Sequence, residues 1–188
     1  MLRIAITGNI AAGKSQVEKI LSEDFPVYDT DIMAHEILDT ITDFYGYDVF
    51  ENGKINRKKL GKLVFSNPNL KEKLEHLIHP KIREKILNIY ERHSNDSFVF
   101  VSVPLLFESG FNDLFDKVLL VTANENIRLE RLKSRNNLSV EEAKQRINAQ
   151  MPQESKLSKA DYIISNNSTF EDLEKQVSQF IKKIKGIP

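Results

Sequence analysis

The chain has 188 residues, of which 40% are hydrophobic and 29% are charged, and its formal net charge at pH 7 is zero. This length and composition predict one substantial core and exclude two full-sized domains, and the balanced charge gives no electrostatic support for nucleic-acid binding. The absence of cysteine excludes disulfides, thiolate catalysis and cysteine-based metal sites, and it fits the reducing cytosol.

The first part of the chain alternates short apolar runs with segments of helical spacing. Residues 2–7, LRIAIT, are apolar and partly β-branched, and a glycine follows them, which predicts a buried strand near the centre of a sheet. From Lys14 onwards, apolar residues recur at helical spacing. The predicted elements are a strand at 2–7, a helix at 14–24, a strand at 26–28, a helix at 32–38 and an irregular stretch at 40–55 with turns at Gly46 and Gly53.

The second part begins with two amphipathic helices, at 56–65 and 69–92. We expect the longer one to be interrupted at His79-Pro80, because proline disfavours the helical conformation of the residue before it. The near-continuous apolar run FVFVSV at 98–103 predicts a strand that is buried on both faces. The remaining predicted elements are a strand at 117–122, helices at 126–134 and 139–150, a strand at 161–165 and a helix at 170–185.

The alternation of strands and helices predicts an α/β fold. Right-handed βαβ crossovers would give a mostly parallel five-stranded sheet with helices on both faces, which is a three-layer α/β/α architecture. The helical insert at 56–92 is longer than a crossover needs. We therefore expect it to form a subdomain over one edge of the site.

The segment GNIAAGKS at residues 8–15 has the spacing of a phosphate-binding loop (P-loop). Gly8 turns the chain directly after the first strand, and Gly13 allows close approach of the backbone. The loop N–H groups and the helix N-terminus would then face an anion. Lys14 would reach the β- and γ-phosphates of ATP, and the Ser15 hydroxyl would hold Mg²⁺. The alternative is a glycine-rich turn that opens an ordinary helix.

Two carboxylates follow the second predicted strand and favour a kinase among P-loop proteins. The chain has no base-reading NKxD segment of the kind that a GTPase needs, whereas Asp29 and Asp31 flank Thr30 at the carboxyl end of a strand. If this segment is extended, the two carboxylates point the same way, and one could accept a hydroxyl proton while the other orients Mg²⁺ or substrate. The alternative is that Asp29 or Thr30 only caps the helix that follows.

Several segments in the same order give the chain a nearly end-to-end resemblance to the dephospho-CoA kinase family. They are the P-loop, Asp29-Thr30-Asp31, LIHP at 77–80, VPLLFE at 103–108, Arg131 to Arg135 (RLxxR), Arg146 to Gln150 (RIxxQ) and the AD-x-I-I-x-N stretch at 160–166. The loop departs from the family's usual GGIGSGKS, since Asn9, Ala11 and Ala12 replace two glycines and a serine.

The resemblance implies a nucleoside-monophosphate-kinase-like core with a helical CoA-binding insert and a mobile lid. The chain would form a single domain, 1–188. Its core would comprise 1–55, 93–125 and 151–188, the insert 56–92 and the lid 126–150.

The resemblance also implies the reaction and the site residues. The γ-phosphoryl group of ATP would pass to the ribose 3′-hydroxyl of dephospho-CoA, with Asp31 as the base or the group that orients the hydroxyl. Lys14 and Mg²⁺ would take the developing charge, Arg135 would come from the lid to the phosphate oxygens, and Ser15 would be the Mg²⁺ ligand. The residues implied for ATP are Gly8, Asn9, Ile10, Ala11, Ala12, Gly13, Lys14, Ser15, Arg135 and Asn166. Those implied for the acceptor are Asp31, His79, Leu105, Arg131 and Arg146.

Other roles are open for several of these residues. The arginines could lie on solvated helix faces, His79 could be structural, and Leu105 could pack in the core with Leu106. Either Asp29 or Glu108 could be the second partner near the metal.

Two other functions are possible, namely a P-loop kinase of another nucleoside or nucleotide and a non-enzymatic ATP-binding switch. No apolar run reaches the length of a signal-peptide core or a membrane helix. We expect a cytoplasmic monomer or weak homo-oligomer that binds ATP and dephospho-CoA, without nucleic-acid or membrane partners.

Overall fold

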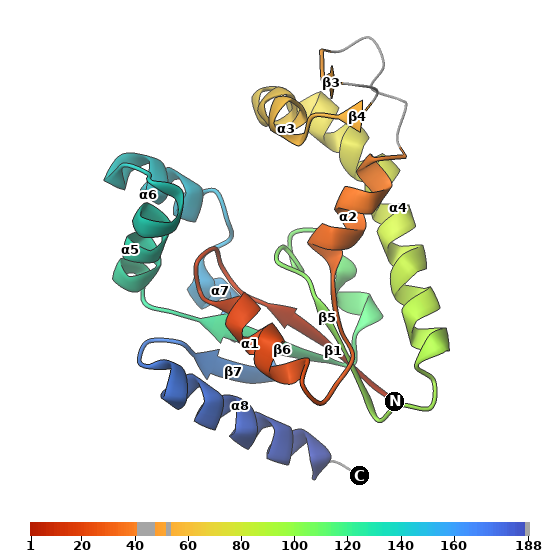
Figure 1. Ribbon diagram of the computed structural model, residues 1–188, viewed down its shortest axis with the longest axis vertical. Helices are drawn as coiled ribbons and strands as arrows, with labels where there is room; N and C mark the ends of the chain where they lie inside the picture. Colours follow the sequence, from red (N-terminus) through yellow and green to blue (C-terminus); the bar gives the residue numbers. More distant parts are fainter. Residues whose placement is uncertain (41–47, 52–53, 187–188) are drawn as a thin grey trace. The chain divides into compact units, whose positions relative to one another are not determined.

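A computed structural model describes residues 1–40, 48–51 and 54–186 (Figure 1). The chain divides into two compact units, one formed by Met1–Tyr28 with His93–Pro188 and the other by Asp29–Arg92. The second unit begins earlier than the helical insert expected at residue 56. Among the described residues, no helix has the length and apolar character needed to cross a bilayer.

The first unit is built on a five-stranded sheet in the order β2-β5-β1-β6-β7. β1 pairs in parallel with β5 and β6, and β6 pairs in parallel with β7 (Figure 1). The predicted mostly parallel five-stranded sheet is therefore confirmed. The strands are β1 (Leu2–Thr7), β2 (Val27–Asp29), β5 (Phe98–Ser102), β6 (Lys117–Thr122) and β7 (Tyr162–Ser165).

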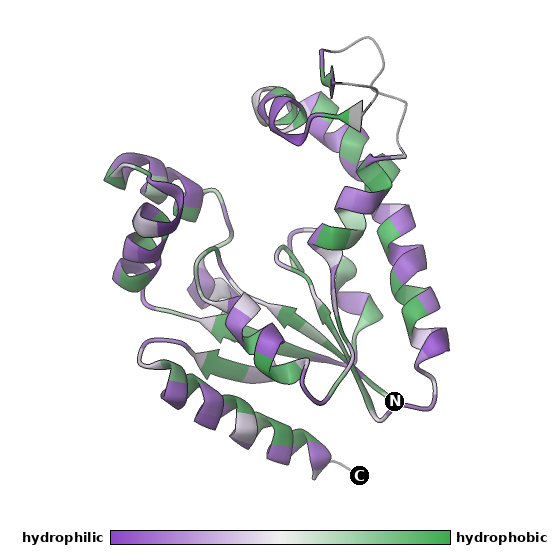
Figure 2. Ribbon diagram, viewed as in Figure 1, coloured by the Kyte–Doolittle hydropathy of each residue, from purple (hydrophilic) through white to green (hydrophobic). Residues whose placement is uncertain are grey.

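Helices α1 (Lys14–Leu21) and α8 (Phe170–Lys185) supply much of the main core. In α8 the buried residues recur every three or four positions, so one stripe of the helix packs against the strands. These buried side chains are Leu173, Val177, Phe180 and Ile184. Figure 2 shows the same alternation, with hydrophobic strands and a helix α8 that is banded polar and apolar. Burial of each such side chain contributes about 1.5–3 kcal/mol.

Two further helices of this unit, α5 (Glu125–Asn136) and α6 (Val140–Asn148), form a hairpin with a small core of its own. Asn137 ends α5 in the left-handed conformation, and Ser139 begins α6 with a capping box that includes Glu142. The structure adds two short elements that the sequence pattern did not predict, the 3₁₀-helix η1 (Phe111–Leu114) and α7 (Gln153–Leu157).

The second unit consists of helices and a short hairpin. Its long helix α4 (Pro68–Arg92) contacts both α2 (Thr30–Leu38) and α3 (Arg57–Ser66). The predicted interruption at His79-Pro80 is wrong, because α4 is continuous through Pro80. A proline inside a helix costs about 3 kcal/mol. Burial of apolar side chains on the same helix, including Ile82 and Ile86, offsets that cost.

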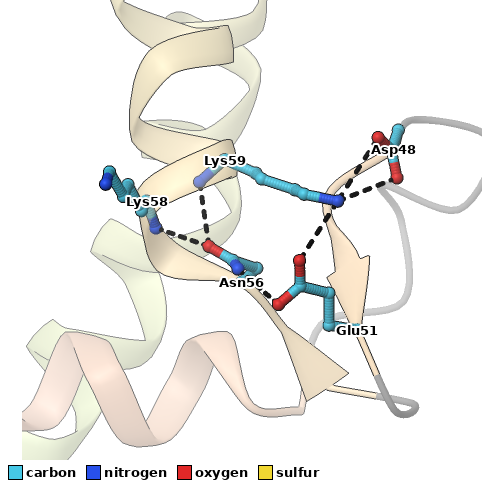
Figure 3. Close-up of polar contacts among 5 residues, drawn as sticks. All are labelled: Asp48, Glu51, Asn56, Lys58 and Lys59. Atoms are coloured by element: carbon cyan, nitrogen blue, oxygen red, sulfur yellow. Dashed lines mark hydrogen bonds and ion pairs between the residues drawn. The ribbon is translucent and has the colours of Figure 1, made fainter.

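Part of the segment predicted to be irregular forms the hairpin of β3 (Phe50–Glu51) and β4 (Lys54–Ile55). Side chains join this hairpin to α3, as Figure 3 shows. Asn56 caps α3 by accepting from the N–H groups of Lys58 and Lys59, and its amide donates to Glu51 Oε2 at 2.6 Å. The turns expected at Gly46 and Gly53 lie outside the described residues.

Lys59 completes this polar cluster, because its ammonium lies 3.2 Å from both Asp48 Oδ1 and Glu51 Oε1. Hydrogen bonds from Asn56 and Lys59 lower the pKa of Glu51, and those to Asp48 and Glu51 raise the pKa of Lys59. These contacts connect the hairpin to the first turn of α3. The charged side chains of the cluster are largely exposed.

Candidate active site

The phosphate loop, residues 8–15, leaves β1 and enters α1, and its two glycines are required by space and by conformation. A Cβ on Gly8 would lie 2.5 Å from the carbonyl oxygen of Val121 in β6. Gly13 has φ +96°, and a Cβ there would lie 1.9 Å from Asn166 Nδ2. The loop therefore fits between α1, β6 and the end of β7 only with glycine at both positions.

Between the two glycines, the backbone is strained at Ala11. Its φ is 62°, in the left-handed region, which costs a residue with a Cβ about 1–2 kcal/mol. The strain therefore lies at a position where the related family usually has glycine. Ile10 and Ala11 also pack against the small core of the α5–α6 hairpin, formed by Leu132, Ala143 and Ile147.

The Lys14 ammonium has two polar partners within the protein. Its ammonium lies 2.6 Å from Glu18 Oε1, one turn further along α1, and it also donates to the hydroxyl of Ser102 at the end of β5. Both charged side chains are largely buried, at 16% and 15% exposed. Glu18 could have been found from its i,i+4 spacing to Lys14, whereas the only signal for Ser102 is its place at the carboxyl end of a central strand.

Arg131 and Asn166 hold the loop from the other side. The Arg131 guanidinium donates to the carbonyl oxygens of Ala11 and Ala12, both at 3.3 Å, and to that of Asn166 at 3.1 Å. Asn166 is buried, and its amide donates to the Ala12 carbonyl at 2.9 Å and to Gln16 Oε1 at 3.2 Å. Arg131 therefore lies against the loop and not on a solvated helix face. Burial lowers its pKa, but a guanidinium remains charged at neutral pH.

The other arginines and the leucine pair are placed differently. Arg135 and Arg146 are exposed, and Arg135 Nε donates to Asn136 Oδ1 at 3.0 Å. Leu106 is fully buried, whereas Leu105 is 46% exposed and is not a core residue. Leu105 is therefore accessible to a ligand, and Leu106 packs in the core.

Glu108 forms an ion pair that the sequence pattern does not predict. Lys156 of α7 is fully buried, and its ammonium lies 2.8 Å from Glu108 Oε1. The same oxygen accepts from the backbone N–H of Met151 at 3.3 Å. A lysine in a short polar segment normally indicates solvent exposure, so neither its burial nor its partner was predictable.

We expect Glu108→Ala to destabilise the protein more than Lys156→Met does. The first change leaves a buried ammonium without an anion, which costs about 3–5 kcal/mol, whereas the second leaves a carboxylate that is 24% exposed and can bind water. Denaturant unfolding of both variants at pH 7 measures the difference. Equal losses would show that the buried ammonium needs no counter-charge.

The acceptor-side residues belong to the second unit. Asp29 is the N-cap of α2, and its Oδ1 accepts from the N–H of Asp31 at 2.7 Å, so the capping role considered for Asp29 is confirmed. The extended backbone that would point both carboxylates the same way is present at Asp29 but not beyond it, because α2 begins at Thr30 and Asp31 lies in its first turn. The Asp31 side chain is exposed. Capping by Asp29 favours this early start of the helix.

His79 lies on α4 and is half-buried. Burial lowers its pKa below the ordinary value, and this effect exceeds the opposite effect of the nearby Glu75. The imidazole is therefore neutral at pH 7 and has one ring nitrogen that donates and one that accepts.

The comparison with known proteins identifies the family to which this site belongs. The family model for dephospho-CoA kinase matches residues 2–172. The chain belongs to the dephospho-CoA kinase family. A dephospho-CoA kinase from Listeria innocua serovar 6a is 38% identical, with 96% of each chain covered.

Solved structures agree with this family assignment. A Thermus thermophilus protein matches with a TM-score of 0.87 and 34% identity over 98% of each chain. A dephospho-CoA kinase from Campylobacter jejuni matches with a TM-score of 0.73 and 36% identity, over 97% of this chain and 96% of its own. The phosphate loop, the parallel sheet and the α5–α6 hairpin described above are thus those of a dephospho-CoA kinase family member.

Proposed function

We propose that this protein transfers the γ-phosphoryl group of ATP to the ribose 3′-hydroxyl of dephospho-CoA, giving CoA and ADP as the last step of coenzyme A synthesis. The observation that carries the proposal is the family match over residues 2–172, which includes a phosphate loop with both required glycines. In the transfer, the 3′-oxygen forms a bond to the γ-phosphorus, the bond from that phosphorus to the bridging oxygen of ADP breaks, and the hydroxyl proton leaves with a base.

We assign the base to Asp31, whose carboxylate is exposed in the first turn of α2. Lys14 would neutralise charge that develops on the β- and γ-phosphates, exchanging Glu18 and Ser102 for phosphate oxygens. The loop N–H groups would contribute fixed dipoles, because Gly13 opens α1 directly beneath them.

The site would hold a Mg²⁺ ion, which would supply positive charge for the phosphates when bound. Ser15 fits the role of its protein ligand, because its side chain is exposed beside Lys14 in the first turn of α1. The described residues contain no cluster of three or more histidine or carboxylate side chains that could hold a metal alone. This agrees with the usual preference of Mg²⁺ for a few protein ligands together with phosphates and water.

We propose that residues 126–150, which include α6 and all but the first residue of α5, act as a lid whose exposed Arg135 and Arg146 reach the substrates. Arg135 would contact ATP, and Arg146, His79 and Leu105 would contact dephospho-CoA. Arg131 and Asn166 would meet the substrates from the positions in which they already hold the loop. We also propose that the protein works in the cytoplasm as a monomer or weak homo-oligomer, without nucleic-acid or membrane partners.

A panel of acceptors tests the reaction. ADP release from Mg-ATP should be fast with dephospho-CoA and at background with AMP, with adenosine and without an acceptor. Phosphorylation of AMP or adenosine in place of dephospho-CoA would favour a kinase of another acceptor. ATP binding with no transfer to any of them would favour a non-enzymatic switch.

A further inference from the structure

The chain between α6 and α7 is tied to the phosphate loop by side chains from both partners. We call Gln150 and Met151 the lid root, because they follow α6 and its C-cap residue Ala149. The N–H of Ile10 donates to Gln150 Oε1 at 2.7 Å, and Asn9 Nδ2 donates to the Met151 carbonyl oxygen at 2.8 Å. Two adjacent loop residues thus bond to two adjacent residues of the lid root.

We propose that Asn9 and Gln150 are positioning residues that fasten the lid root to the phosphate loop before a nucleotide binds. This proposal rests on the proposed function and deepens it. Both bonds depend on a side chain, so they are properties of these two residues and not of the backbone path. A glycine at position 9 would have no side-chain amide with which to bond the Met151 carbonyl oxygen.

The burial of Asn9 argues against a role in overall stability. Its side chain is only 3% exposed, and its Oδ1 has no hydrogen-bond partner within the described part of the chain. An unpaired buried acceptor opposes folding, so it cancels much of what the single bond to Met151 contributes. What the residue does provide is a fixed distance between loop and lid root.

Other contacts hold the lid root and helix α5 independently of Asn9 and Gln150. The Met151 N–H donates to Glu108, which is itself held by the buried Lys156, so the lid root has a second support that does not involve the loop. At the other end of the hairpin, Arg131 of α5 holds the carbonyl oxygens of Ala11 and Ala12. Loss of Asn9 or Gln150 therefore weakens the attachment on the α6 side, while the Arg131 contacts and the apolar packing of Ile10 and Ala11 remain.

Hydrogen exchange of the nucleotide-free protein tests the proposal without reference to turnover. In Asn9→Ala and Gln150→Met we expect the amides of residues 140–151 to exchange about fivefold faster, the factor that corresponds to one lost hydrogen bond. The amide of Ile10 should also lose protection in Gln150→Met. Equilibrium binding of ATP should weaken by a similar factor, because binding must then order the loop and lid root.

Two further variants serve as controls. Asn148→Ala makes the same chemical change on an exposed residue of α6 and should leave exchange and ATP affinity unchanged. Gln150→Glu keeps an oxygen that can accept from Ile10 and should retain slow exchange. The proposal would be overturned if the amides of residues 140–151 exchanged no faster in Asn9→Ala and Gln150→Met than in Asn148→Ala. It would also be overturned if Gln150→Glu lost as much protection from exchange as Gln150→Met. Because no acceptor is present, failure of the proposed reaction would leave these results interpretable.

Discussion

Lys14→Ala is expected to lower turnover about a hundred- to a thousandfold and to weaken ATP binding as well. The ammonium is the only side-chain cation within the loop, residues 8–15, and it follows Gly13 directly at the start of α1. Removing it leaves residues 8–15 with backbone dipoles but no charged side chain of their own to balance the triphosphate. Steady-state kinetics with dephospho-CoA and equilibrium ATP binding measure the two effects separately.

The matched control for Lys14→Ala is Lys19→Ala on the same helix. Lys19 is exposed and lies outside the loop, so its loss removes the same charge from the protein without touching the phosphates. Its turnover should stay within twofold of the wild type. Full activity in Lys14→Ala would contradict the phosphate-loop assignment itself.

Asp31→Asn is expected to lower turnover about a hundred- to ten-thousandfold while ATP affinity stays within twofold. An amide has nearly the shape of a carboxylate but cannot accept the hydroxyl proton of the acceptor. Because Asp31 is on the surface of the first turn of α2, the substitution should not disturb the fold. Single-turnover measurement of phosphoryl transfer, together with equilibrium ATP binding, distinguishes the chemical step from nucleotide binding.

Asp29→Asn provides the comparison for Asp31→Asn. An asparagine at position 29 still offers an oxygen to the Asp31 N–H, so the cap of α2 persists and activity should fall little. If Asp31→Asn lost ATP binding and turnover in equal measure, Asp31 would belong to nucleotide or metal binding. A large loss in Asp29→Asn would identify Asp29 as the second residue near the metal.

The sheet and most helices were predictable because their patterns are long and unambiguous. The apolar run at 98–103 indicates a strand, and the three- or four-residue spacing at 170–185 indicates a helix; both elements are present. Two-residue strands such as β3 and β4 are too short to show a period. The continuity of α4 through Pro80 depends on burial along the whole helix, which local sequence preference does not report.

The site was predictable in its chemistry but not in its contacts. Gly8, Gly13, Lys14 and Ser15 follow from spacing alone. The reasons for the glycines lie in Val121 and Asn166, which are more than a hundred residues away along the chain. The strain at Ala11 was likewise not predictable, because the spacing of the motif does not report the backbone angles of the residues between its glycines.

The contacts of Arg131 have a further consequence for how fast ATP binds. Within the described part of the chain, the Arg131 guanidinium donates only to neutral oxygens, which belong to Ala11, Ala12 and Asn166. Its positive charge is thus not cancelled locally, unlike that of Lys14 beside Glu18. The free loop carries an attractive potential for a polyanion, and the association rate of ATP should fall as ionic strength shortens the Debye length.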